Sequence, residues 1–133
     1  MSYLYLLDTN ILSDLVRHPR GKIFSKIREV GEETICTSII VACELKFGAE
    51  KKNSRRLKER VNLVLEMLPI LPLLPNMAQD YAIIRTHLER LGTPIGGNDL
   101  LIATHALNKD LTVVTENIRE FSRVPNLKVE NWL

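Results

Sequence analysis

Short apolar runs alternate along the chain with longer stretches in which apolar residues recur every three or four positions. The first run, Tyr-Leu-Tyr-Leu-Leu at 3–7, stops at Asp8 and has the length of a buried strand rather than of a helix. Four more short runs favour strands, at 34–37, 70–71, 111–114 and 127–129. The pattern therefore predicts about five strands.

The longer stretches have the period of amphipathic helices. Their apolar spacing predicts helices over 11–16, 23–30, 39–51, 55–67, 77–90 and 99–107. Ser38 stands where an N-cap is needed, and either Asn53 or Ser54 can cap the helix after it. Strands that alternate with helices predict an α/β fold around a parallel sheet. Right-handed crossovers would bring the strand ends to one edge, where α/β proteins usually carry their sites.

The composition narrows the class of protein. The chain has 133 residues, 45% apolar and 26% charged, which fits one globular domain over 1–133 and excludes a disordered chain. Lys and Arg total 18 against 16 acidic residues, so any nucleic acid must be bound by a local basic patch. The sequence contains no apolar stretch of membrane-spanning length, and we expect that its first residues, which include Asp8 and no basic residue, are not a signal peptide. We expect a cytoplasmic protein without membrane contact, in which Cys36 and Cys43 are buried, reduced thiols.

Three acidic residues stand in unusual places. Asp8 ends the first strand and Asp99 starts an otherwise apolar helix. Glu44 falls on the apolar side of its helix, which the spacing predicts to include Ile40 and Phe47. Asp8 can equally serve as a helix cap, and Asp99 as a favourable charge at a helix N-terminus. Glu44 is harder to explain structurally, because burial of an unpaired charge is costly. If the three converge, a cation must neutralise them, and carboxylate oxygens select Mg²⁺ or Mn²⁺.

A basic segment follows Glu44. Seven of the 18 basic residues fall within fifteen positions, among them Lys46, Lys51, Lys52, Arg55 and Arg56. Such a segment is often only a solvated helix surface. Next to a metal-dependent nuclease site, it would bind the phosphate backbone with an affinity that falls with salt.

Four ordered segments across the whole chain resemble the motifs of the PIN-domain nucleases. They are Leu-Asp-Thr-Asn at 7–10, the Glu44 helix at 38–48, Pro-Ile-Gly-Gly-Asn-Asp-Leu-Leu-Ile-Ala at 94–103, and Val-Val-Thr-Glu-Asn with Glu-Phe at 113–121. More narrowly, the chain resembles the VapC-type toxins of bacterial VapBC toxin–antitoxin pairs, in the branch that cuts initiator tRNA.

The resemblance implies a three-layer α/β fold and a Mg²⁺-dependent endoribonuclease, with Mn²⁺ as an alternative ion. Asp8 and Asp99 match the principal metal ligands of the family, and Glu44 matches its third acid. The residues matched to supporting roles are Thr9 and Asn10, which orient Asp8, and the hydroxyls of Ser38 and Thr115, which line the site.

One position departs from the family pattern. Many PIN domains have an aspartate where this chain has Asn117. The missing charge can be supplied by Glu120, three residues further on, or less directly by Glu116. The number of metal ions, one or two, is therefore left open by the sequence.

The resemblance also implies partners. It predicts a cognate VapB-type antitoxin, a tRNA substrate cut in the anticodon stem-loop, and contact with operator DNA only through the antitoxin. The surplus of apolar residues over 61–74 suits the core, a homodimer face or a groove for an antitoxin helix.

Other functions compete with this prediction. A metal-dependent nuclease with another RNA target fits the same residues, and so does a catalytically silent PIN-type binding module, although the presence of all three acids argues against the latter. A phosphohydrolase with Asp8 as nucleophile would need a second aspartate at the position of Asn10. His105 lies on the Asp99 helix and is expected to pack or cap rather than to catalyse.

Overall fold

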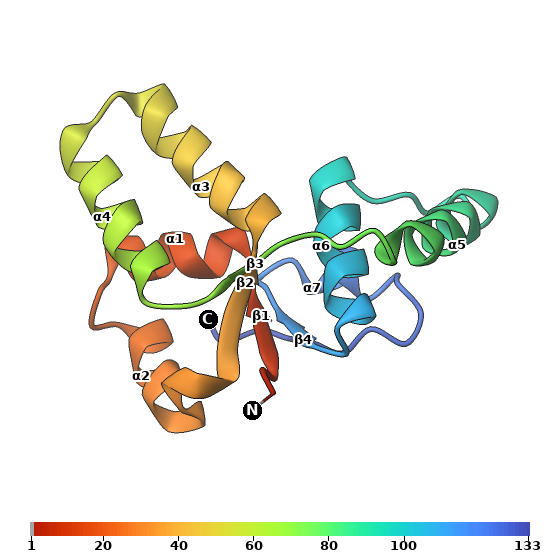
Figure 1. The fold of residues 1–133 in the computed structure, drawn as a ribbon, viewed down its shortest axis with the longest axis horizontal. Helices are drawn as coiled ribbons and strands as arrows, with labels where there is room; N and C mark the ends of the chain where they lie inside the picture. The colour runs from red at the N-terminus through yellow and green to blue at the C-terminus, as the bar shows by residue number, and fades with distance from the viewer. Residues whose placement is uncertain (1) are drawn as a thin grey trace.

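Five parallel strands form the centre of the computed structural model, which describes residues 2–133 (Figure 1). The strands are β1 (Tyr5–Leu7), β2 (Ile35–Ser38), β3 (Ile70–Leu71), β4 (Thr112–Val114) and β5 (Val129–Glu130). Their order across the sheet is β3-β2-β1-β4-β5, and every neighbouring pair is parallel. The predicted parallel sheet is confirmed.

Helices cover both faces of this sheet. They are α1 (Thr9–Arg17), α2 (Lys22–Val30), α3 (Ile39–Lys52), α4 (Arg55–Glu66), α5 (Met77–Arg90), α6 (Gly97–Asn108) and α7 (Ile118–Phe121), with a 3-10 turn at Glu32–Thr34. In Figure 1 the helices α1, α2 and α4 lie on one side of the strands and α5 and α6 on the other. The predicted three-layer α/β fold is thereby confirmed. The turn and α7 are too short to leave a periodic pattern in the sequence.

Polar residues at strand ends begin the next helices. Asp8 follows β1 and caps α1, and the hydroxyl of Ser38 at the end of β2 accepts from the Ile40 N–H at 3.1 Å. Ser54 caps α4, whereas Asn53 ends α3 in the left-handed conformation, with φ of 48°. Ser54 is therefore the N-cap, and Asn53 closes the helix before it.

The inward face of α3 differs from the prediction. The buried residues are Val41, Ala42, Leu45 and Ala49, while Phe47 is 66% exposed. The prediction failed because apolar residues surround this helix on all sides, so their spacing does not single out one face. Cys43 is exposed, contrary to expectation, whereas Cys36 is buried in β2, and both are free thiols.

The core lies on both faces of the central strands. Leu6, Leu7 and Val113 are fully buried, as parallel strands between two helical layers require. Among residues 2–133, no helix combines the length and the apolar composition that crossing a membrane requires.

Candidate active site

The strand order reverses direction at β1. The chain proceeds from β1 to β2 and β3 on one side, and β4 and β5 lie on the other side. Ligands of open α/β sheets bind at such a switch point, outside the carboxyl ends of the strands. Asp8 follows β1 and Thr115 follows β4, so both residues stand at this switch point.

Asp8 is held there by three donors. Its Oδ1 accepts from the Thr9 N–H at 2.8 Å, and its Oδ2 accepts from the hydroxyl of Thr115 at 2.7 Å and from the amide of Asn10 at 3.3 Å. Burial raises the pKa of Asp8, and the charge of Glu44 adds to this, against the lowering effect of the three hydrogen bonds. Asp8 is thus both a helix cap and an oriented carboxylate.

Glu44 connects α3 to two other helices. Its Oε1 accepts from the hydroxyl of Thr9 at 2.5 Å, and its Oε2 accepts from the amide of Asn98 at 3.2 Å. The side chain is half-buried and lines an open hollow. Although Glu44 falls on the apolar side of its helix in the sequence pattern, its carboxylate lies at a polar cavity together with Asp8 and Asp99.

Asp99 shares an amide with Glu120. The Nδ2 of Asn117 donates to Asp99 Oδ2 at 3.3 Å and to Glu120 Oε2 at 2.5 Å. Burial raises the pKa of Asp99 to about 7, and the nearby carboxylates of Asp8, Glu120 and Glu44 contribute to the rise. The Asn117 hydrogen bond lowers the pKa of Glu120, which also accepts from the Gly96 N–H.

These side chains surround an open hollow of about 510 Å³, here called the acid cavity. It is lined by Asp8, Thr9, Asn10, Ser13, Arg17, Glu44, Asp99, Glu116 and Asn117. The cavity therefore brings together the three acids that the sequence singled out, and Thr9, Asn10 and Asn117 with them.

Two predicted hydroxyls lie behind the cavity rather than in its wall. Thr115 is fully buried, and its hydroxyl donates to Asp8 from behind the cavity wall. Ser38 is also fully buried, and its Oγ lies 2.8 Å from His105 Nδ1 on α6. His105 is packed, as expected, and its Nε2 is without a hydrogen-bond partner among the described residues. Burial lowers the pKa of His105, and the charge of Lys109 acts in the same direction.

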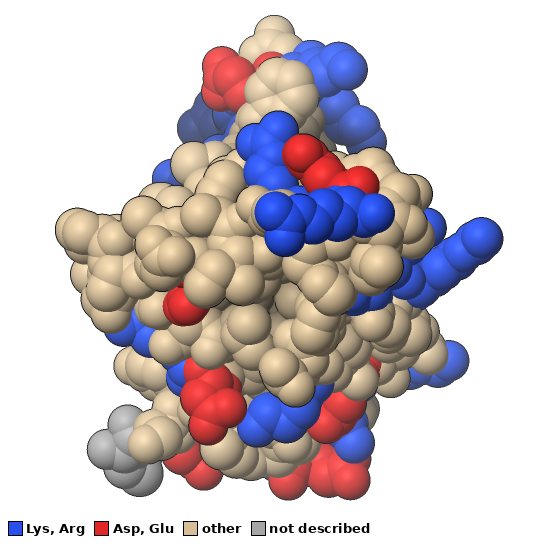
Figure 2. All heavy atoms as spheres, turned by 90° about the vertical axis from the view of Figure 1, so that its right-hand side faces the viewer, with Lys and Arg blue, Asp and Glu red and all other residues tan. Residues whose placement is uncertain are grey.

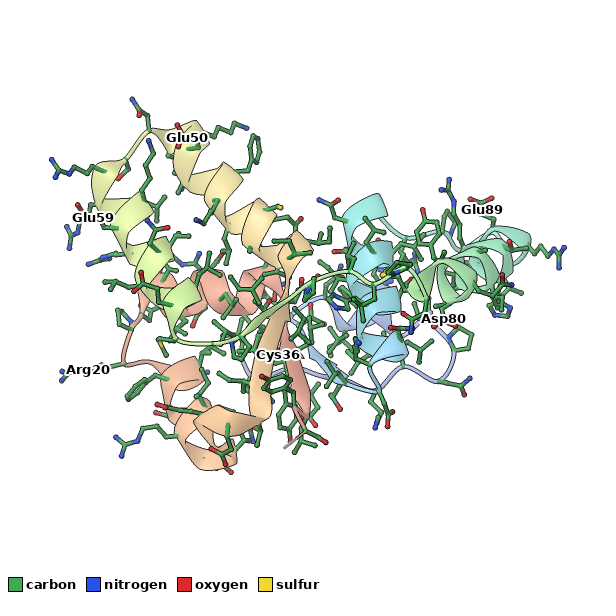
Figure 3. All side chains as sticks on the ribbon, viewed as in Figure 1. Arg20, Cys36, Glu50, Glu59, Asp80 and Glu89 are labelled. Atoms are coloured by element: carbon green, nitrogen blue, oxygen red, sulfur yellow. The ribbon has the colours of Figure 1, made fainter. Side chains whose placement is uncertain are left out.

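The basic segment lies apart from the acids. Lys46, Lys51 and Lys52 occupy the distal half of α3, and Arg55 and Arg56 begin α4; all five are exposed. Figure 1 shows these helices as a hairpin that rises away from the sheet, and the labelled Glu50 and Glu59 mark the same hairpin in Figure 3. Glu59 pairs with Arg55 at 3.2 Å and so offsets part of the positive charge.

The face of the molecule on the side of α5 and α6 has no such concentration of positive charge among the described residues. On the face shown in Figure 2, Lys and Arg side chains are interspersed with Asp and Glu, and much of the middle is uncharged. Mixed charge of this kind suits a solvated surface rather than a polyanion site.

The sequence analysis did not single out Ser13 and Arg17 of the cavity wall, nor Asn98, the partner of Glu44. Thr9, Ser13 and Arg17 recur every four positions on α1, and all three line the cavity, opposite the buried apolar face of that helix. This polar stripe was a readable signal for Ser13 and Arg17. Asn98, which holds Glu44, gives no such signal, because a lone amide before Asp99 resembles any loop residue.

The chain matches the PIN domain family over residues 5–127. It is 37% identical over 131 residues to Ribonuclease VapC2 of Rickettsia felis, which covers 97% of this chain and 98% of the relative. The tRNA(fMet)-specific endonuclease VapC of Salmonella typhimurium is 34% identical over 129 residues, covering 96% and 97%. The crystal structure of VapBC2 from Rickettsia felis, bound to a DNA fragment from their promoter, has a TM-score of 0.90 at 36% identity, over 98% of this chain and 99% of that one. The chain belongs to the PIN-domain family and, within it, to the VapC ribonucleases of toxin–antitoxin systems.

The acid cavity fits a divalent cation by its chemistry. Its acidic lining offers only hard oxygen donors, and the carboxylates raise one another's proton affinity, which a cation would relieve. Over residues 2–133, however, no three Asp, Glu, His or Cys side chains are arranged to hold one ion together. Asp8, Glu44 and Asp99 are instead turned toward amides or hydroxyls, as with Glu44 toward Thr9 and Asn98.

Proposed function

We propose that this chain is a toxin that cuts single-stranded RNA with a divalent metal ion, Mg²⁺ or Mn²⁺, in the acid cavity. The observation that supports this most directly is the gathering of Asp8, Glu44 and Asp99 around one cavity at the switch point of the sheet. Asp8 and Asp99 would hold the ion, and Glu44 would act as the third acid.

The other polar residues hold these acids in place. Thr115, Thr9 and Asn10 direct both oxygens of Asp8, and Asn98 directs Glu44. Asn117 keeps Asp99 beside Glu120, so the charge expected from an aspartate at position 117 is supplied by Glu120. The number of ions depends on whether Glu120 reaches the cavity during catalysis.

The chemistry follows from this lining. A divalent metal ion held by Asp8 and Asp99 would supply activation of a water molecule and stabilisation of charge on the phosphoryl group. Hydrolysis of this kind would leave a 3′-hydroxyl and a 5′-phosphate. A histidine-based mechanism, which ends in a 2′,3′-cyclic phosphate, would need imidazoles at the site. The residues that line the cavity include none, and His105 is buried outside it.

The proposed substrate is initiator tRNA, cut in its anticodon stem-loop. Support comes from the relative in Salmonella typhimurium named a tRNA(fMet)-specific endonuclease. A loop also suits the site, because an open cavity accepts a single strand whose backbone can be splayed for attack. The basic segment on α3 and α4 would bind flanking phosphates.

The proposed protein partner is a VapB-type antitoxin. The Rickettsia felis neighbour was solved as a VapBC complex on promoter DNA, and we propose that DNA contacts this chain only through its antitoxin. An apolar hollow of about 140 Å³ between α1 and α4 is lined mainly by Leu15, Val16, Pro19, Leu63, Val64 and Met67. Leu63 and Met67 are exposed here and would pack against an antitoxin helix. A homodimer of this chain stays a prediction.

Cleavage of total tRNA tests the function. Incubation with Mg²⁺ should shorten initiator tRNA, and EDTA or the substitution Asp99→Asn should prevent it. Products should carry a 5′-phosphate. A cyclic phosphate would contradict the metal-water chemistry, and intact initiator tRNA beside another cut RNA would contradict the substrate. Complete inertness of the pure, folded chain would favour the silent binding module.

A further inference from the structure

A second groove opens from the acid cavity. It has a volume of about 160 Å³ and shares four wall residues with the cavity, namely Thr9, Ser13, Arg17 and Glu44. From there it runs between α1, α3 and α4 to Lys52, over a floor that includes Leu45, Ala49 and Val61. The cavity, the groove and the α3–α4 hairpin therefore form one continuous path. We call the second hollow the side groove.

Arg17 stands where the two hollows meet. It is the single basic residue among those that line the acid cavity, whose wall also carries Asp8, Glu44, Asp99 and Glu116. Its side chain is 62% exposed, and its guanidinium lies 3.8 Å from the carboxylate of Asp14. An anionic strand that approaches four carboxylates needs a cation beside them, and guanidinium binds phosphate in a bidentate manner.

Gly48 keeps the side groove open. It lies inside α3, where glycine is destabilising relative to alanine, so its presence there needs a reason. A Cβ atom built at Gly48 would have no neighbour within 4 Å, which shows that packing within the chain does not require glycine. The missing side chain instead leaves room in the wall of the groove.

We propose that the side groove is the subsite for the RNA strand that flanks the cut. Arg17 binds the phosphate next to the scissile one, Gly48 leaves room for the nucleotide, and Lys52 binds the following phosphate. The inference rests on the proposed ribonuclease function, and it adds where the RNA next to the cut is bound. Charge favours RNA over a peptide as the occupant, because both basic residues of the groove lie along one path that leads to the basic hairpin.

Binding of a fluorescent single-stranded oligoribonucleotide of roughly ten nucleotides, a length that spans such a path, tests Arg17. Anisotropy is measured in EDTA, so that the RNA stays intact. We expect Arg17→Gln to weaken binding about tenfold, the loss of one charged hydrogen-bonding group. The slope of affinity against salt should become shallower by about 0.7.

Arg20→Gln is the matched control. It removes the same charge three residues further on, but Arg20 lines neither hollow, and Figure 3 shows its side chain directed away from the sheet. We expect binding close to that of the parent. Equal losses in the two variants, or a parent that does not bind the RNA, would overturn the proposal. Failure of the parent to cut tRNA with Mg²⁺ would instead count against the proposed function.

Gly48→Leu tests the groove itself. The substitution should leave the thermal midpoint at or above that of the parent, because leucine favours helices and a Cβ atom at this position meets no neighbour within 4 Å. RNA binding and cleavage should both fall about tenfold or more as the leucine fills the path. Ala82→Leu on the exposed surface of α5 places a leucine on another helix and should change neither RNA binding nor cleavage. Parent-like RNA binding with loss of antitoxin capture would assign the groove to a protein segment and overturn the proposal.

Discussion

Thr115 and Asp8 are 107 positions apart in sequence, yet the hydroxyl of Thr115 donates to the Oδ2 of Asp8 at 2.7 Å. Asp8 is only 3% exposed and Thr115 is fully buried. The same hydroxyl accepts from the Asn117 N–H at 3.0 Å. One oxygen therefore positions the acid after β1 and also the loop after β4.

Thr115→Val should reduce cleavage roughly 10–100-fold, the usual effect of losing a residue that orients a metal ligand. The valine has the same shape but cannot donate, so the pKa of Asp8 should rise further above its ordinary value. The rate profile should then shift toward higher pH, which a loss of packing alone would not cause. Thr112→Val on the same strand is the control, and Thr115→Ser should restore most of the activity. A variant with parent rates at every pH would show that this hydrogen bond is dispensable.

Asp99→Asn should abolish cleavage and stabilise the metal-free protein at neutral pH. The pKa of Asp99 is about 7 in the folded chain against an ordinary value of 3.8. Between these values the folded state keeps a proton that the unfolded state has released, so stability falls as pH rises through this window. The asparagine removes that slope.

Thermal midpoints from pH 4 to 8 in EDTA measure this effect. Asp110→Asn removes an exposed carboxylate elsewhere and should leave the slope in place. Mg²⁺ should raise the midpoint of the parent more than that of Asp99→Asn. Identical pH slopes for the parent and Asp99→Asn would contradict the raised pKa of Asp99.

Asn117→Asp should make the fold more dependent on metal. The amide now donates to both Asp99 and Glu120, and a carboxylate there would repel them instead. We expect a lower thermal midpoint in EDTA and a larger gain on addition of Mg²⁺ or Mn²⁺. Calorimetric titration of Mn²⁺ would report the affinity directly, with Asn131→Asp near the end of the chain as the control. An unchanged midpoint in EDTA would contradict this prediction, because it would show that the new carboxylate is not repelled by Asp99 and Glu120.

His105 should make the protein less stable in acid. Burial holds the pKa of His105 below its ordinary value of 6.5, so the folded state resists a proton that the unfolded state accepts. Stability is therefore lost as pH falls through and below that value. His105→Gln should weaken this dependence and cost about 1–3 kcal/mol through the disturbed contact with Ser38. Urea unfolding at pH 5 and pH 8 tests it, and His87→Gln, an exposed residue, should behave like the parent. Equal pH dependence in both variants would exclude His105 as its source.

The local signals in the sequence predicted the framework well. Asp8 ends an apolar run and Ser38 precedes a helical period, and each of these features depends only on neighbouring residues. The parallel sheet followed from the alternation of strands with helices. What failed depended on tertiary packing: the spacing in α3 did not show that Phe47 turns to solvent and Glu44 to the acid cavity.

The acids themselves could be selected from the sequence because each stands where an acid is locally unexpected. One of their partners, Asn98, could not be. It is a polar residue in an ordinary position, and only the packing of α3 against α6 brings its amide to Glu44. Ser38 shows the reverse. The sequence predicted it in the wall of the cavity, but in the structure its Oγ contacts His105 behind that wall.

The acids of the cavity come from distant parts of the chain. Asp8 follows the first strand, Glu44 lies on α3, and Asp99 lies on α6, beyond residue 90. A nascent chain that has left the ribosome only as far as α5 therefore carries two of the three carboxylates and lacks the strand that leads to Thr115. Fragments left by interrupted translation or by proteolysis lack a complete set of acids in the same way. With the three acids as the proposed active site, a cell that makes this toxin is exposed to its nuclease only after the last third of the chain has been synthesised and has folded against the first.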